Sequence, residues 1–182
     1  MTLERLALST QARDLRQAFD AAFAAPPPPP APPTVALLLV RAGGETLAIR
    51  RDEMTGFARA ENIVSAPGRS PAFLGLAGLR SGLYPVWSLA ILLGRPDAPA
   101  DWLVLAEARS SAPCAFACEA FERVLFVPEA ALASPARRDV QAGLSPAVVP
   151  WGSSLAPLVD LPALQADIWN RKESAQPRRT TL

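Results

Sequence analysis

The most informative absence in this 182-residue chain is histidine, which occurs nowhere. A chain without histidine contains no phospho-accepting histidine, no Ser-His-Asp triad, no Cys-His pair and no histidine-ligated metal. The sequence also lacks a phosphate-binding loop, a Gly-x-Ser-x-Gly nucleophile motif and a dinucleotide fingerprint. It therefore predicts no catalytic residue, no cofactor and no metal site. A small enzyme on a β-barrel stays as an alternative that a polar pocket with perturbed titratable groups would support.

Cysteine and net charge are also scarce. Cys114 and Cys118 are four residues apart, so in a strand they share a face but lie too far apart for an easy disulfide. We expect buried, reduced thiols. The net charge of +1 gives no electrostatic basis for binding nucleic acid. Uncharged runs are too short or too broken by proline and glycine to span a bilayer, and the charges scattered through residues 1–25 argue against a signal peptide. We expect a cytoplasmic protein without membrane insertion.

Apolar residues are abundant, and they gather in a central stretch over residues 71–94. Two apolar segments, 73–79 and 83–87, flank a polar link at residues 80–82. Two apolar runs around a short link containing glycine predict a β-hairpin. Ser88 follows the second run and is a good helix N-cap, because its hydroxyl can accept an unpaired backbone N–H. The stretch therefore predicts strand, turn, strand and one capped helical turn.

Part of this stretch has a counterpart 72 residues later, because the segment 157–164 repeats the segment 85–92. Both segments begin with proline, have an N-cap residue at the fourth position (Ser88 or Asp160), and have leucine at the fifth and eighth positions. Coincidence in a chain rich in alanine, proline and leucine is one interpretation. The other is that the chain contains two related halves, each ending in a strand and a capped helical turn.

The N-terminal region has a different character. Leu15, Phe19 and Phe23 recur at i, i+4 and i+8, so residues 1–25 are predicted to form an amphipathic helix. Its apolar stripe either docks on the protein's own core or binds a partner, and the sequence favours neither. Residues 26–33 read PPPPPAPP, which predicts a polyproline II linker about 25 Å long. A spacer is favoured over a ligand for an aromatic-lined groove.

From Thr34 onward the pattern indicates β-structure, with hairpins predicted over residues 35–50 and 102–121. Each half reads as hairpin, connector, hairpin and helical turn, and about five short strands per half suit a small SH3-like barrel. Asp160 is expected to cap a last helix, and residues 171–182 are expected to be a disordered tail.

The central stretch resembles the signature of the CheW family of chemotaxis adaptors. In that family a proline-aromatic approach leads into a strand, an Asn-Leu-Arg-Gly turn, apolar residues, a proline and a short capped helix. The positions that match are Leu79, Arg80, Pro85 and Leu89. Ser88 stands where the family usually has aspartate, and Gly78 and Ser81 replace the usual Asn and Gly. The resemblance covers residues 34–168.

The resemblance implies a mainly β fold of two intertwined SH3-like five-stranded β-barrel subdomains, with short helices besides the N-terminal helix. The CheW-like domain would occupy residues 34–170, with halves at about 34–95 and 101–168 and strand exchange between them. The resemblance also implies a non-enzymatic adaptor that couples chemoreceptors to a CheA-type histidine kinase. Its partners would be the kinase's regulatory domain and the receptor's cytoplasmic tip, close to membrane receptor arrays.

The resemblance suggests partner-binding residues at the hairpin link, Arg80 and Ser81, and in the connector before it, Met54 and Phe57. Arg80 is the only charge between Arg69 and Arg95. Its guanidinium either satisfies carbonyls between the two barrels or makes a recognition contact. An alternative function is a localisation or anchoring module with the same fold, whose N-terminal helix recruits a different partner.

Overall fold

The computed structural model describes residues 12–20, 23, 32–68, 70–79, 82–107, 112–132 and 143–174, with side chains up to residue 170. The chain divides into two compact units, Met1–Pro32 and Pro33–Leu182. No helix in the described ranges is long and apolar enough to cross a membrane.

In the first unit, residues 12–20 are helical, and so is residue 23. Leu15, Phe19 and Phe23 are 67%, 63% and 77% exposed, and the rings of Phe19 and Phe23 are 4.6 Å apart. The contact between Phe19 and Phe23 places these two members of the predicted apolar stripe on one face of the helix. The other residues of the predicted helix, and the linker up to residue 31, lie outside the described residues, so their boundaries stay predictions.

The second unit consists of strands and short helices. Its first half contains β1 (Thr34–Ala42), β2 (Glu45–Arg50), the 3-10 turn η1 (Arg51–Glu53), β3 (Gly56–Arg59), β4 (Ile63–Val64), β5 (Phe73–Leu79), β6 (Gly82–Ser88) and α2 (Leu89–Leu92). Its second half contains β7 (Trp102–Ala106), β8 (Cys114–Cys118), β9 (Ala120–Pro128), the 3-10 turn η2 (Glu129–Ala131), β10 (Leu144–Trp151), β11 (Ser154–Val159) and α3 (Leu161–Ser174).

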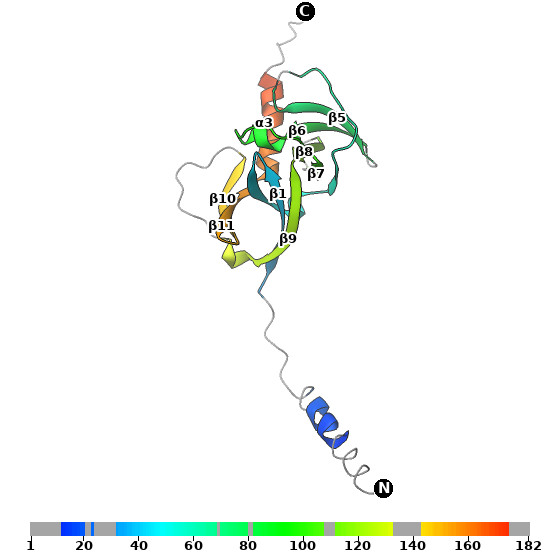
Figure 1. Cartoon of the computed structure of the whole chain (residues 1–182), viewed down its shortest axis with the longest axis vertical. Helices are drawn as coiled ribbons and strands as arrows, with labels where there is room; N and C mark the ends of the chain where they lie inside the picture. Colours follow the sequence, from blue (N-terminus) through cyan, green and yellow to red (C-terminus); the bar gives the residue numbers. More distant parts are fainter. Residues whose placement is uncertain are drawn as a thin grey trace, which may run out of the picture. The chain divides into compact units, whose positions relative to one another are not determined.

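The strands form two sheets, and each sheet takes strands from both halves. One has the order β10-β11-β2-β1-β9 and the other β3-β7-β8-β6-β5-β4. Figure 1 shows this exchange by colour, since the cyan β1 lies beside the yellow-green β9 and shares its sheet with the yellow-orange β10 and β11. The predicted fold class is confirmed, including the intertwining, and the short β4 adds a sixth strand to the second sheet.

The two sheets have the same topology. Each of five strands in the first half has a counterpart in the second half: β1 corresponds to β7, β2 to β8, β3 to β9, β5 to β10 and β6 to β11. Exchanging these counterparts turns the strand order of one sheet into that of the other, and only β4 has no counterpart among the described strands. The parallel pairs also correspond, because β6 pairs with β8 and β11 pairs with β2. The chain therefore consists of two related halves, as the repeat predicted.

The repeated segments occupy equivalent positions in this scheme. Val86 lies opposite Ala115 in the β6–β8 pair, and Leu158 lies opposite Ala48 in the β11–β2 pair. The Ser88 hydroxyl accepts the Ile91 N–H at 3.3 Å, and the Asp160 carboxylate accepts the Ala163 N–H at 2.8 Å. Both predicted caps are confirmed, at the same offset of 72 residues that separates the two proline-led segments.

The central strands are buried on both faces. Alternate residues of β1, β2, β7 and β8 point into the core of their own sheet or into a shared core between the two sheets. The shared core includes Leu38, Val40, Leu47, Ile49, Val104, Cys114, Phe116, Cys118, Leu89 and Leu161. Strands covered on both sides read as continuous apolar runs, which explains why CAFAC shows no polar alternation.

The side chains of Cys114 and Cys118 belong to this shared core, and both are buried as predicted and are not joined in a disulfide. Burial raises the pKa of Cys118 to about 12, with the Glu119 carboxylate adding to the shift. A thiol with such a pKa stays protonated and unreactive at neutral pH.

Two boundaries differ from the prediction. The strand expected over residues 114–121 ends at Cys118, because Glu119 carries the chain from one sheet to the other. There the Glu119 N–H donates to the Arg41 carbonyl and its carboxylate accepts the Gly44 N–H, each at 2.8 Å. α3 also continues to Ser174, so the prediction of a disordered tail is wrong for residues 171–174. The residues after 174 lie outside the described part.

Candidate partner-binding site

The hairpin link that carries Arg80 and Ser81 lies outside the described residues. The strands on either side are described, and Leu79 and Gly82 lie opposite each other at the end of the β5–β6 ladder. The hairpin itself is therefore confirmed. The roles of Arg80 and Ser81 stay predictions.

Met54 lies in the shared core with only 6% of its surface exposed. Its carbonyl accepts a hydrogen bond from Arg51 Nη1 at 3.1 Å, and the next residue, Thr55, donates its N–H to the Leu105 carbonyl at 2.9 Å. These bonds and the buried side chain fix the start of β3. The Met54 side chain thus anchors the connector in the shared core and leaves almost none of its own surface exposed.

Phe57 lies in β3 and packs against aromatic side chains from two other strands. Its ring stacks on Trp102 of β7, with centroids 4.7 Å apart and planes 9° from parallel. Phe121 of β9 meets both rings edge-on, at 5.4 Å from Phe57 and 6.4 Å from Trp102. We call Phe57, Trp102 and Phe121 the junction cluster, because β9 belongs to one sheet and β3 and β7 belong to the other.

The register explains why these three rings meet. Phe57 lies opposite Val104, Trp102 opposite Cys118, and Phe121 opposite Val40. All three opposing residues belong to the shared core. Because cross-strand partners point to the same face, the junction cluster continues the shared core to the surface. Phe121 is 38% exposed there, and Phe57 and Trp102 are partly buried.

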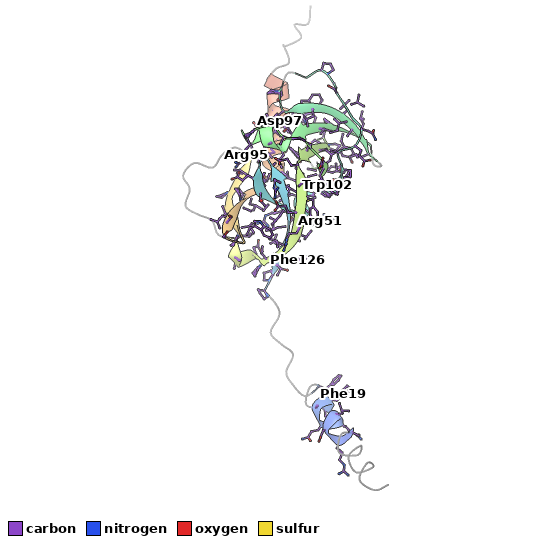
Figure 2. All side chains as sticks on the ribbon, in the orientation of Figure 1. Phe19, Arg51, Arg95, Asp97, Trp102 and Phe126 are labelled. Carbon is purple, nitrogen blue, oxygen red and sulfur yellow. The ribbon has the colours of Figure 1, made fainter. Side chains whose placement is uncertain are left out.

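The apolar surface continues along β9. Val124 and Phe126 lie opposite Leu38 and Ala36, on the same face as Phe121, and they are 45% and 72% exposed. A bulge after Phe121 keeps these three residues on one face. In Figure 2 the labels of Trp102 and Phe126 mark the two ends of this surface. Exposed apolar residues that lie together, unlike single ones, indicate an interaction site.

The chemistry of this surface suits binding. Within the described residues, no group of three or more His, Cys, Asp or Glu side chains could hold a metal ion. Aromatic residues are enriched where proteins bind one another, because they bury a large area with little loss of side-chain freedom. The resemblance suggests Phe57 as a partner contact, which stays a prediction, and does not indicate Trp102 or Phe121, since no local pattern shows that β9 begins beside β3.

Two intertwined subdomains with an exposed aromatic surface at their junction define a protein-interaction module. The model of the CheW-like domain matches residues 36–168, and the chain belongs to this family. The crystal structure of the scaffolding protein TtCheW from Thermoanaerobacter tengcongensis is similar, with a TM-score of 0.62, 13% identity, and coverage of 75% of this chain and 90% of that chain. No curated protein matches the chain. The family match supports a scaffold or adaptor role in chemotaxis.

Proposed function

We propose that this protein is a non-enzymatic adaptor that couples chemoreceptors to a CheA-type histidine kinase in chemotaxis or motility signalling. It acts in the cytoplasm, clustered with membrane receptor arrays. Its partners are the kinase's regulatory domain and the receptor's cytoplasmic tip. The family match over residues 36–168 supports this proposal, and the observation that carries it is the junction cluster. A partner that contacts both subdomains at once would bind with an affinity that depends on how the two subdomains are oriented relative to each other.

In this proposal Phe57 makes the partner contact and Met54 holds it in place from the core. Arg80 and Ser81 act at the hairpin link, either by shaping this surface or by a contact of their own. An arginine at such a position suits a binding hot spot, because its planar group forms several hydrogen bonds at once.

The test is a pair of binding titrations. The full chain is titrated with the regulatory domain of the CheA-type kinase and, separately, with the cytoplasmic tip of a chemoreceptor, both from the same organism. We expect both to bind, and Phe121→Ala to weaken at least one interaction about tenfold, or about 1.4 kcal/mol. Leu155→Ala is the matched control, because Leu155 is 63% exposed on β11 and separated from β9 by β2 and β1. Failure of both proteins to bind would reject the adaptor function.

A second candidate function is a localisation or anchoring module. The three exposed apolar side chains on the helix of the first unit favour it. Removing residues 1–33 separates the two functions. The adaptor should bind kinase and receptor as before, whereas an anchor should lose its own partner and its position in the cell while the β domain stays folded.

A further inference from the structure

Arg59 ends β3 on the same face as Phe57, and its side chain packs on the junction cluster. The guanidinium carbon lies 4.0 Å from the centre of the Trp102 ring, the ring on which Phe57 also stacks. An arginine held against an aromatic face loses little further freedom when it binds a ligand, so it is prepared for recognition.

Within the described residues, Arg59 forms no ion pair. The ion pairs found within the described residues join Arg41 to Glu122 and Arg95 to Glu45, and Arg59 takes part in neither. Arg59 is exposed, and its guanidinium carries five N–H donors in a planar fork. That fork matches the two oxygens of a carboxylate.

We propose that the junction cluster and Arg59 form a two-part docking surface for a protein segment that carries an apolar side chain next to an aspartate or glutamate. The apolar side chain packs on Phe57 and Phe121, and the carboxylate binds the guanidinium of Arg59. The inference rests on the proposed function, because the segment belongs to one of the two adaptor partners, and it adds the chemistry by which that partner is recognised.

The surroundings of Arg59 favour a carboxylate over a phosphate. Glu61 follows Arg59 by two residues, and Asp101 directly precedes Trp102, with its carbonyl accepting the Ala60 N–H at 2.9 Å. Acidic residues this close in the chain disfavour a phosphate group, which carries up to two negative charges, more strongly than a carboxylate, which carries one. A segment with one carboxylate beside one apolar side chain is complementary to this surface, because the carboxylate pairs with the single arginine and the apolar side chain packs on the aromatic rings.

The chain contains a matched control for Arg59. The guanidinium of Arg123 lies 4.8 Å from the centre of the Trp151 ring, so it makes the same kind of contact. Arg123 lies opposite Leu39, which together with Trp151 belongs to the core of its own sheet. Arg123 therefore points to the opposite face of β9 from the junction cluster.

The experiment uses the full chain with a blocked peptide, Leu-Glu-Ala-Leu, and its Leu-Gln-Ala-Leu counterpart, followed by NMR at millimolar peptide. We expect the glutamate peptide to shift the Trp102 indole signal and the β3 amides several times more than the glutamine peptide. Arg59→Gln should abolish that difference, Arg59→Lys should reduce it, and Arg123→Gln should leave it unchanged. No preference of the wild type for the glutamate peptide, or a preference that survives Arg59→Gln, would overturn the inference.

A second arm repeats the kinase and receptor titrations with Arg59→Glu. We expect at least tenfold weaker binding of one partner, while Arg123→Gln binds as the wild type does. If both partners bind Arg59→Glu as they bind the wild type, the inference is wrong although the adaptor function holds. If neither partner binds the wild type, the adaptor function is rejected, and the peptide result alone decides whether the surface recognises carboxylates.

Discussion

Glu53 and Leu161 are 108 residues apart in the sequence, yet the Glu53 carboxylate accepts the Leu161 N–H at 3.1 Å. Leu161 begins α3 and is fully buried in the shared core. The first N–H groups of a helix have no partner inside it, so a carboxylate from elsewhere can satisfy one of them. Asp160 satisfies a second. The connector that leads to Met54 and Phe57 is thereby attached to the helix of the other half.

Substitution of Glu53 should change how stability depends on pH. Burial, the largest influence, raises the pKa of Glu53 above its ordinary value of 4.5, and Asp160 and Asp52 raise it further, while the Leu161 N–H and Arg50 lower it. A raised pKa means that the folded state holds the proton more tightly than the unfolded state. Stability from this group is thus present at low pH and is lost as pH rises through the folded pKa.

We therefore expect Glu53→Gln, which keeps an acceptor for the Leu161 N–H, to be at least as stable as the wild type at neutral pH and to lose this pH dependence. Glu53→Ala removes the acceptor and should cost about 1 kcal/mol. Urea unfolding from about pH 4 to about pH 8 measures both effects. A Glu53→Gln variant that follows the wild-type profile throughout would show that Glu53 does not titrate in this range.

Met54 should behave as a core residue. Met54→Leu conserves volume, so we expect a loss below about 1.5 kcal/mol and unchanged partner affinity. Met54→Ala leaves a cavity and should cost about 2–5 kcal/mol in the free energy of unfolding. Thermal unfolding and the kinase and receptor titrations test this directly. If a fully stable Met54→Leu variant bound a partner more weakly than the wild type, Met54 would have to contact that partner directly.

Gly75 and Gly78 of β5 should respond differently to alanine. Gly75 has a φ of +138°, and a Cβ there would overlap the Val64 carbonyl oxygen in the neighbouring β4. At Gly78 no atom of the described residues lies within 4 Å of an added Cβ. We expect Gly75→Ala to cost about 1–3 kcal/mol and Gly78→Ala to stay within about 0.5 kcal/mol. Equal melting temperatures for the two variants would contradict the difference in the room that the two positions leave for a Cβ atom.

Arg80→Ala distinguishes a structural arginine from a recognition contact. We expect lower thermal stability, because acceptors that lose the guanidinium are left unpaired at about 1–3 kcal/mol each. A hot spot would instead weaken partner binding by more than about 2 kcal/mol with the melting temperature nearly unchanged. Differential scanning fluorimetry and the binding titrations separate the two. If neither quantity changes, Arg80 is an ordinary solvated turn residue.

The features predicted correctly from the sequence are those that short segments encode. Ser88 and Asp160 predict the start of their helices correctly, because an N-cap bonds to a backbone N–H only three residues further along the chain. The resemblance places Met54 in the connector that is expected to bind a partner, but it does not report burial, and the Met54 side chain is only 6% exposed. The meeting of Phe57 with Phe121 depends on a contact between strands 64 residues apart, and no periodicity reports such a contact.

The exchange of strands has a consequence for how the chain can be divided. A cut in the loop between α2 and β7 leaves one fragment holding β1 and β2 without β9 and β11, and the other holding β7 and β8 without β3 and β6. Neither fragment contains a complete sheet, so each would expose the apolar face that the other covers. The two fragments would regain structure only by association. Neither half is therefore expected to fold alone as a monomer.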